Sequence, residues 1–238
     1  MSVIGSGEIE YRLIFAQSAM TVQRAIPTLI AAAILAACAS QPTNQVSAAG
    51  EQVSQTAARP LERMAGQQVL VLPVQYISFQ DSLGWQQAVP NSSAYLARLD
   101  TVIASTFTAR GLGQAWTFGP EVARAARLNS IIMPNARALS AEWLRGRLLP
   151  DQTVREPLAS QVRSLVGLKG SRYALLPVEI RFQGKGGTGV ATLRLVMIDS
   201  RLAQVRWAGE VRSDPARSFS PALAGSIAAR FADLVAEP

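Results

Sequence analysis

The sequence contains no histidine and only one cysteine among its 238 residues. Without histidine, the chain cannot carry a Ser-His-Asp or Cys-His nucleophile pair, a histidine-ligated metal ion or an imidazole that shuttles protons near neutral pH. A single cysteine cannot form an internal disulfide or a thiolate zinc cluster. These two absences exclude whole classes of catalytic and metal-binding site.

Lysine is also scarce. The 23 basic residues exceed the 16 acidic ones and give a net charge of +7, yet only Lys169 and Lys185 are lysines, and the arginines are scattered singly. Since there is no run of basic residues and no interleaving with aromatics, we expect no nucleic-acid binding, whereas a mild attraction to anionic lipid or glycan surfaces fits the charge. Charged residues make up only 16% of the chain and apolar residues 49%, which predicts a protein that folds around a core.

The residues before the lone cysteine have the order of a secretory signal peptide. Arg24 precedes an uncharged apolar stretch of 13 residues, 25–37, which ends in small residues and is too short to span a bilayer as a helix. The end of this stretch, Leu35-Ala36-Ala37-Cys38, resembles the lipobox of bacterial lipoproteins, and that resemblance implies that the signal peptidase recognises Leu35, Ala36 and Ala37 and that Cys38 is acylated. The alternative is a buried or membrane-anchoring helix with an incidental cysteine.

The chain after Cys38 turns polar and predicts a flexible tether over residues 38–67, followed by one periplasmic domain over 68–238. Residues 1–37 would then be an N-terminal extension plus the signal peptide. The extension is unusual because it carries Glu8 and Glu10, so translation starting at Met20 is an open alternative to Met1. Position 39 is Ala rather than the Asp that retains many lipoproteins at the inner membrane, which favours lipid anchoring at the outer membrane.

The folded part alternates between strand and helix patterns. The spacing predicts strands at 68–77, 114–118, 173–182, 190–198 and 204–212, with a loop at 78–93. It predicts helices at 94–110, 119–128, 140–148 and 157–166 and a last helix from Pro221. We expect Ser92 or Ser93 to cap the first helix, Gly111 to end it, and Ser220 to cap the last one. This order predicts an α/β fold, in which helices pack on a mixed sheet that ends in a three-strand antiparallel meander and a C-terminal helix.

The third meander strand predicts two different faces. Val205, Trp207 and Val211 alternate with Arg206, Glu210 and Arg212, so we expect one buried face and one solvated face. The opening run at 69–74, the helix end Arg110-Gly111, and the pair 193–199 and 204–209 resemble bacterial envelope lipoproteins with a TolB-N-like or CsgG-like α/β domain. The resemblance covers most of 68–238 in the order of its elements. It implies a protein that works through contacts with envelope proteins or with copies of itself.

The motifs that could carry chemistry have simpler structural explanations. The loop Gly184-Lys185-Gly186-Gly187-Thr188-Gly189 resembles part of a phosphate-binding loop, but a strand follows it instead of a helix, so we expect a hairpin tip. Among the carboxylates, Glu179 and Glu210 alternate with arginines as on a solvated sheet, and nothing marks them or Asp199 as a catalytic pair. We therefore predict no enzymatic activity, no catalytic residue, no metal and no cofactor.

Two functions remain open at this stage. The first is a non-enzymatic outer-membrane lipoprotein facing the periplasm, anchored through Cys38 and acting in assembly, secretion or transport as a monomer or an oligomer. The second is a periplasmic module that binds a glycan or another anionic ligand. The candidate contact residues for either are Trp85, in a polar loop next to glycine, and the exposed Arg206 and Arg212. The other tryptophans, Trp116, Trp143 and Trp207, have a core or interface interpretation. Any small-molecule ligand is unknown.

Overall fold

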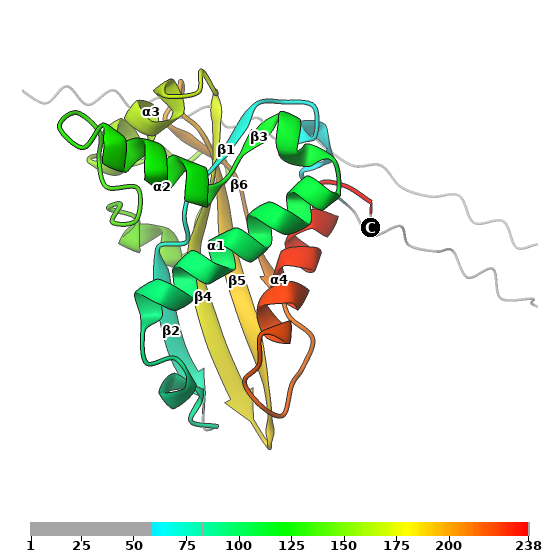
Figure 1. Cartoon of the computed structure of the whole chain (residues 1–238). Helices are drawn as coiled ribbons and strands as arrows, with labels where there is room; N and C mark the ends of the chain where they lie inside the picture. The colour runs from blue at the N-terminus through cyan, green and yellow to red at the C-terminus, as the bar shows by residue number, and fades with distance from the viewer. Residues whose placement is uncertain (1–58, 82, 238) are drawn as a thin grey trace, which may run out of the picture. The chain divides into compact units, whose positions relative to one another are not determined.

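A single mixed sheet organises the part of the chain that the computed structural model describes, residues 59–81 and 83–237 (Figure 1). Its order is β3-β1-β4-β5-β6, and β2 pairs with β4 beyond the end of β1. The strands are β1 (Val69–Val71), β2 (Tyr76–Asp81), β3 (Trp116–Thr117), β4 (Tyr173–Lys185), β5 (Thr188–Asp199) and β6 (Gln204–Arg212). The helices are α1 (Ser92–Ala109), α2 (Gly119–Leu128), α3 (Leu158–Gly167) and α4 (Ala222–Asp233). The predicted α/β class is confirmed.

Parallel and antiparallel pairing divide the sheet. The strands β1, β2 and β3 run parallel to their neighbours, an arrangement that requires crossover connections such as the helices provide, whereas β4, β5 and β6 form the expected antiparallel meander. The β4–β5 hairpin closes through Gly186 and Gly187, both at positive φ, so the glycine-rich loop is a tight hairpin tip as predicted. The turn at 199–201 between β5 and β6 is also confirmed.

The strand predicted at 68–77 is wrong in one respect, because it splits into β1 and β2 around Pro73. Proline has no N–H to donate to a ladder. The next donor, the N–H of Val74, is buried and donates instead to the Asp100 carboxylate of α1 at 2.9 Å. After this interruption β2 resumes pairing with β4 and extends through part of the predicted 78–93 loop.

One face of the sheet is covered by α1 and α4, which lie side by side across β4 and β5 in Figure 1. Leu99, Ile103 and Phe107 of α1 and Ile227 and Phe231 of α4 form a first apolar cluster with this face. The N-cap of α1 is Asn91, whose side chain accepts from the Ala94 N–H, so the predicted Ser92 or Ser93 cap is wrong by one or two residues. Gly111 has the expected left-handed backbone.

The opposite face carries a second apolar cluster at the end of the sheet near β1 and β3. Leu70, Leu176 and Ile198 alternate with residues of the first cluster along their strands, and α3 covers them with Leu158 and Val162. The helix predicted at 140–148 is only a short 3₁₀ turn, Glu142–Arg145, whose Leu144 is buried in this cluster. The other predicted helices lie within a few residues of α2, α3 and α4. The last of these begins after Pro221 without the predicted Ser220 side-chain cap.

Irregularities in β4 and β6 change which residues share a face. The β5–β6 register passes from Met197 opposite Trp207 to Ile198 opposite Val205, which leaves Arg206 as an extra residue. As a result, Val205 packs in the second cluster while Trp207 and Val211 pack with the first. The predicted single buried face of 204–212 is therefore wrong, because a bulge reverses the alternation.

The packed chain begins earlier than the predicted boundary at residue 68. Leu61 is buried in the first cluster, and its N–H donates to the Leu234 carbonyl at 3.0 Å. The carbonyl of Met64 accepts from the Trp116 indole at 3.1 Å. The described residues from position 59 onward hold both apolar clusters, so we expect the segment Val53–Pro238 to fold by itself. No helix in the described ranges is long and apolar enough to cross a membrane.

Candidate interaction surface

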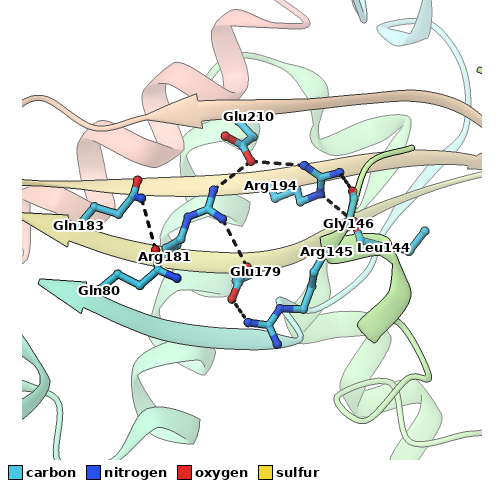
Figure 2. Close-up of polar contacts among 9 residues, drawn as sticks. All are labelled: Gln80, Leu144, Arg145, Gly146, Glu179, Arg181, Gln183, Arg194 and Glu210. Carbon is cyan, nitrogen blue, oxygen red and sulfur yellow. Dashed lines mark hydrogen bonds and ion pairs between the residues drawn. The ribbon is translucent and has the colours of Figure 1, made fainter. Parts of the chain in front are cut away.

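Beyond the second apolar cluster, the same face of the sheet becomes polar and forms the arginine–glutamate face, defined here as Arg145, Glu179, Arg181, Arg194 and Glu210 (Figure 2). These residues come from β4, β5, β6 and the 142–145 turn. The apolar cover ends here, so charged side chains replace aliphatic ones along the strands.

A bulge in β4 sets the position of this face. The β4–β5 register shifts between Pro177 and Glu179, so that Glu179 stands opposite Arg194, which in turn stands opposite Glu210 of β6. Opposite charges on directly paired positions attract across the ladder. One row across three strands is therefore acid, base, acid.

The carboxylate of Glu179 is the buried centre of the face, with its side chain only 4% exposed. It accepts an ion-paired hydrogen bond from Arg145, and the Arg181 guanidinium lies 3.9 Å from its other oxygen. The Arg145 guanidinium also lies over the Tyr76 ring, 5.5 Å from its centroid. A buried carboxylate needs such partners, because an unpaired charge removed from water is strongly destabilising.

The side chain of Arg194 ties the irregular 142–146 segment to the sheet. Its Nε donates to the Leu144 carbonyl at 2.7 Å, and another nitrogen donates to the Gly146 carbonyl. The same guanidinium lies 3.3 Å from Glu210, which also accepts from Arg181 at 3.0 Å (Figure 2). Three arginines thus share two glutamates, so the side chains of the face are held by hydrogen bonds and ion pairs and their net charge is positive.

The two arginines predicted as contact residues have different surroundings. In the strand register, Arg212 stands opposite Thr192 of β5, and Thr192 stands opposite Arg181 of β4, so Arg212 borders the arginine–glutamate face. Arg212 is exposed and forms no ion pair with any residue that the structure describes. Arg206, the bulge residue, pairs with Asp151 near the other end of β6. Of the two, only Arg212 offers an uncommitted charge.

Trp85 was expected at the surface, and that expectation is wrong. Its side chain lies in the first cluster and is only 3% exposed, with its ring edge-on to Phe182 and Phe219 at 6.0 Å from each. The polar loop folds back so that Trp85 lies above Gly189, where no side chain intervenes. A tryptophan buried in this way fills the core and does not contact a partner.

The remaining tryptophans are divided between core and surface. Trp116 is buried beside Phe107. Trp207 is half-buried over Gly209, and Trp143 is half-buried under the Arg155 guanidinium at 5.2 Å. Trp143 stands two residues before Arg145 in the sequence.

The carboxylates considered for catalysis are all bound by arginines. Asp199 accepts from Arg172 at 2.9 and 2.6 Å and from two N–H groups of the β5–β6 turn. Burial alone would raise the pKa of Asp199, but these hydrogen bonds and the Arg172 charge outweigh it and hold the pKa below its ordinary value. No three His, Cys, Asp or Glu side chains come together to hold a metal within the described ranges. These carboxylates act as fixed anions that organise turns and strands.

The lipobox residues Leu35, Ala36, Ala37 and Cys38 lie outside the described residues. Within the described part, the sequence reasoning missed Arg145, Arg194 and the buried Asp100. Arg194 carried a signal, since it interrupts an otherwise apolar strand and so needs a polar partner at that position.

Comparisons with known proteins gave structural likeness only. No family model and no curated protein matches the chain. Among solved structures, it is similar to a dodecameric PelC variant from Paraburkholderia phytofirmans, with 14% identity and a TM-score of 0.35 over 72% of this chain and 91% of that one. It is also similar to lipoprotein GNA1162 from Neisseria meningitidis, with 17% identity and a TM-score of 0.35 over 67% and 90%. A third is the LpoB C-terminal domain from Escherichia coli, with 14% identity and a TM-score of 0.29 over 67% and 97%. At TM-scores below 0.5, this likeness decides nothing about function.

Proposed function

We propose that this chain is a lipid-anchored protein of the outer membrane that faces the periplasm and acts without enzymatic chemistry, through contacts with other envelope proteins. The observation that carries the proposal is Leu35-Ala36-Ala37-Cys38, placed behind Arg24 and the apolar stretch 25–37. The only cysteine of the chain stands at the position that such a motif requires. An acyl chain on Cys38 would hold the domain at the membrane without a spanning helix.

Acyl labelling tests the anchor. The full chain, expressed in a Gram-negative host with labelled palmitate, should incorporate the label, and Cys38→Ser should not. Ala39→Asp is the matched change beside it: the label should remain, while the protein moves from the outer-membrane to the inner-membrane fraction. Label on the Cys38→Ser protein would refute the anchor, and an unchanged location of Ala39→Asp would refute the outer-membrane address.

The arginine–glutamate face supports the protein-contact part of the proposal. Its side chains are held by one another and by backbone carbonyls. The side chains of this face would therefore lose little conformational entropy when a partner docks. Arg212 at its border supplies a free positive charge for an acidic partner surface.

A photo-crosslinking residue tests this surface in the envelope. At position 212 it should capture a partner, whereas at Arg98, an exposed arginine of α1 with no ion pair to a described residue, it should not. In the 212 protein, Glu210→Arg makes the face more positive, so it should increase capture of the acidic partner that the proposal expects. Equal capture at 212 and 98, or capture at neither, would contradict the surface.

The second candidate is a module for a glycan or another anionic ligand, which Arg212 alone now favours. Trp85 is buried and Arg206 is paired, so two of its three predicted contacts are lost. It predicts that an acidic glycan such as polygalacturonate raises the melting temperature of Val53–Pro238 and that Arg212→Gln abolishes the rise. No shift with the unaltered protein would eliminate this candidate.

A further inference from the structure

Three apolar side chains stand out into solvent at the end of α2 and in the turn that follows it. Leu128 is 79% exposed, Ile131 99% and Ile132 72%. We call these three residues the apolar tip. Single exposed leucines are common on protein surfaces, but two adjacent isoleucines this exposed, with a leucine close by, form a patch that calls for a partner.

The helix that leads to the tip is basic on its exposed side. Arg124 and Arg127 are exposed, and neither forms an ion pair with a residue that the structure describes. The helix's own acid, Glu121, lies at its other end, where Lys169 pairs with it at 2.5 Å. The neighbourhood of the apolar tip is therefore positive and uncompensated.

We propose that the apolar tip enters the interfacial layer of an anionic phospholipid bilayer, with Arg124 and Arg127 against the lipid phosphates. Apolar side chains that project beyond a basic helix face are the arrangement by which peripheral proteins bind such a surface. The tip is convex, since Ile131 makes almost no contact with the rest of the chain. A bilayer accepts a convex tip anywhere on its surface, whereas a protein partner would need a matching pocket.

This contact is a second membrane attachment, distinct from acylation of Cys38. It does not require the anchor, because the tip belongs to the segment Val53–Pro238, which lacks Cys38. A failed acyl-labelling experiment therefore leaves the tip untouched, and a failed vesicle experiment leaves the anchor untouched. With both in place, the domain would be held at two points, and the tip would limit the orientations that it can adopt on the membrane.

Vesicle binding of Val53–Pro238 tests the proposal. The segment should sediment with vesicles of phosphatidylethanolamine and phosphatidylglycerol, and Ile131→Ser combined with Ile132→Ser should lower the partition coefficient about tenfold or more. The matched control is Leu149→Ser combined with Leu202→Ser, which removes two other exposed apolar side chains, 61% and 53% exposed, and should leave binding unchanged. Urea unfolding midpoints should be the same for all three proteins.

Charge and depth provide two further measurements. Arg124→Gln and Arg127→Gln should each lower binding to the anionic vesicles about fivefold and leave binding to pure phosphatidylcholine vesicles unchanged. Because Val53–Pro238 is free of cysteine, an environment-sensitive dye on Ile131→Cys should shift to the blue on anionic vesicles, while the same dye on Leu202→Cys should not.

Three results would overturn the proposal. The first is no sedimentation of the unaltered segment with anionic vesicles, and the second is binding that survives Ile131→Ser with Ile132→Ser. The third is that the segment does not bind vesicles but associates with itself at rising concentration, and that the double change abolishes this self-association. That result would assign the tip to contact with a second copy of the chain.

Discussion

Asp100 is a buried carboxyl group, and loss of its proton should make the protein less stable as the pH rises through the acidic range. Its side chain is only 2% exposed. One oxygen accepts from the Val74 N–H at 2.9 Å, and the other lies 2.7 Å from the Arg137 guanidinium. Burial raises the pKa of Asp100 from 3.8 to about 6, and the hydrogen bond from Val74 and the charge of Arg137 offset only part of this effect.

The sign and size of the effect follow from linkage. Because the folded state holds the Asp100 proton more tightly than the unfolded chain, the contribution to stability is fully present below the unfolded pKa of 3.8 and is lost as the pH rises through about 6. A shift of about two pH units corresponds to about 3 kcal/mol of unfolding free energy lost across this window. The chain has no histidine, so no imidazole titrates over the same range.

Urea unfolding of Val53–Pro238, followed by tryptophan fluorescence at a series of pH values, measures how the unfolding free energy changes with pH. The unaltered segment should lose stability between about pH 4 and about pH 7, and Asp100→Asn should largely remove this loss, because the amide oxygen still accepts from Val74 but cannot ionise. Arg137→Gln is a control that should act in the opposite direction. It removes the charge that lowers the pKa of Asp100, so the protein should go on losing stability to a higher pH. The reasoning would be refuted if the unfolding free energy of Asp100→Asn fell with pH as steeply as that of the unaltered segment, or if the stability of the unaltered segment rose with pH across this window.

Three further changes test the packing and the turns. Gly189→Ala would place a Cβ 2.6 Å from the buried Trp85 ring, so it should lower the unfolding free energy by about 1 to 3 kcal/mol in urea titrations; an unchanged value would contradict the burial of Trp85. Asp199→Asn should cost about 1 to 3 kcal/mol near neutral pH by weakening the bonds from Arg172, and since the pKa of Asp199 is lowered, the deficit should disappear as the pH falls below about 4. Leu61→Ala should cost about 2 to 4 kcal/mol by thermal or urea unfolding, and no cost would mean that residues 59–67 are not part of the core.

The meander was predictable because its information is local. The bounds of β6, Gln204–Arg212, agree with the predicted strand, and β4 and β5 each extend only a few residues further toward their shared hairpin. Antiparallel neighbours joined by tight turns need only alternation and turn residues to be recognised. Glu210 could be assigned to a solvated face for the same reason, but the same prediction for Glu179 is wrong, because its side chain is buried.

The faces of these strands were less predictable, because a bulge depends on the partner strand. Nothing in the local sequence around Val178 or Arg206 shows that one extra residue is accommodated there. A shift by one residue moves every later side chain to the other face. The sequence could therefore predict charged residues on the sheet but not that Glu179 would be buried between Arg145 and Arg181.

Trp85 shows a related limit. A tryptophan in a polar loop beside a glycine is expected at the surface only if nothing folds over the loop. The missing information lay about a hundred residues away, at Gly189, where the absence of a side chain leaves room for the indole ring against Phe182. Glycine within a strand is a recognised sign that another group approaches closely, and here it identifies the burial site of Trp85.

Asp100 and Pro73 together explain a feature that neither explains alone. Pro73 interrupts the first strand inside the core, where the next N–H, that of Val74, has no ladder partner and is shielded from solvent. An acceptor had to come from the packed face of α1, so an acidic residue stands next to Leu99 in its apolar stripe. Gly119 completes the arrangement, since a Cβ there would lie 3.1 Å from the Pro73 Cα and 3.2 Å from the Asp100 carboxyl carbon. The strand break, the acid in the helix and the glycine at the start of α2 are thus one structural unit, and changing any one of them should disturb the other two.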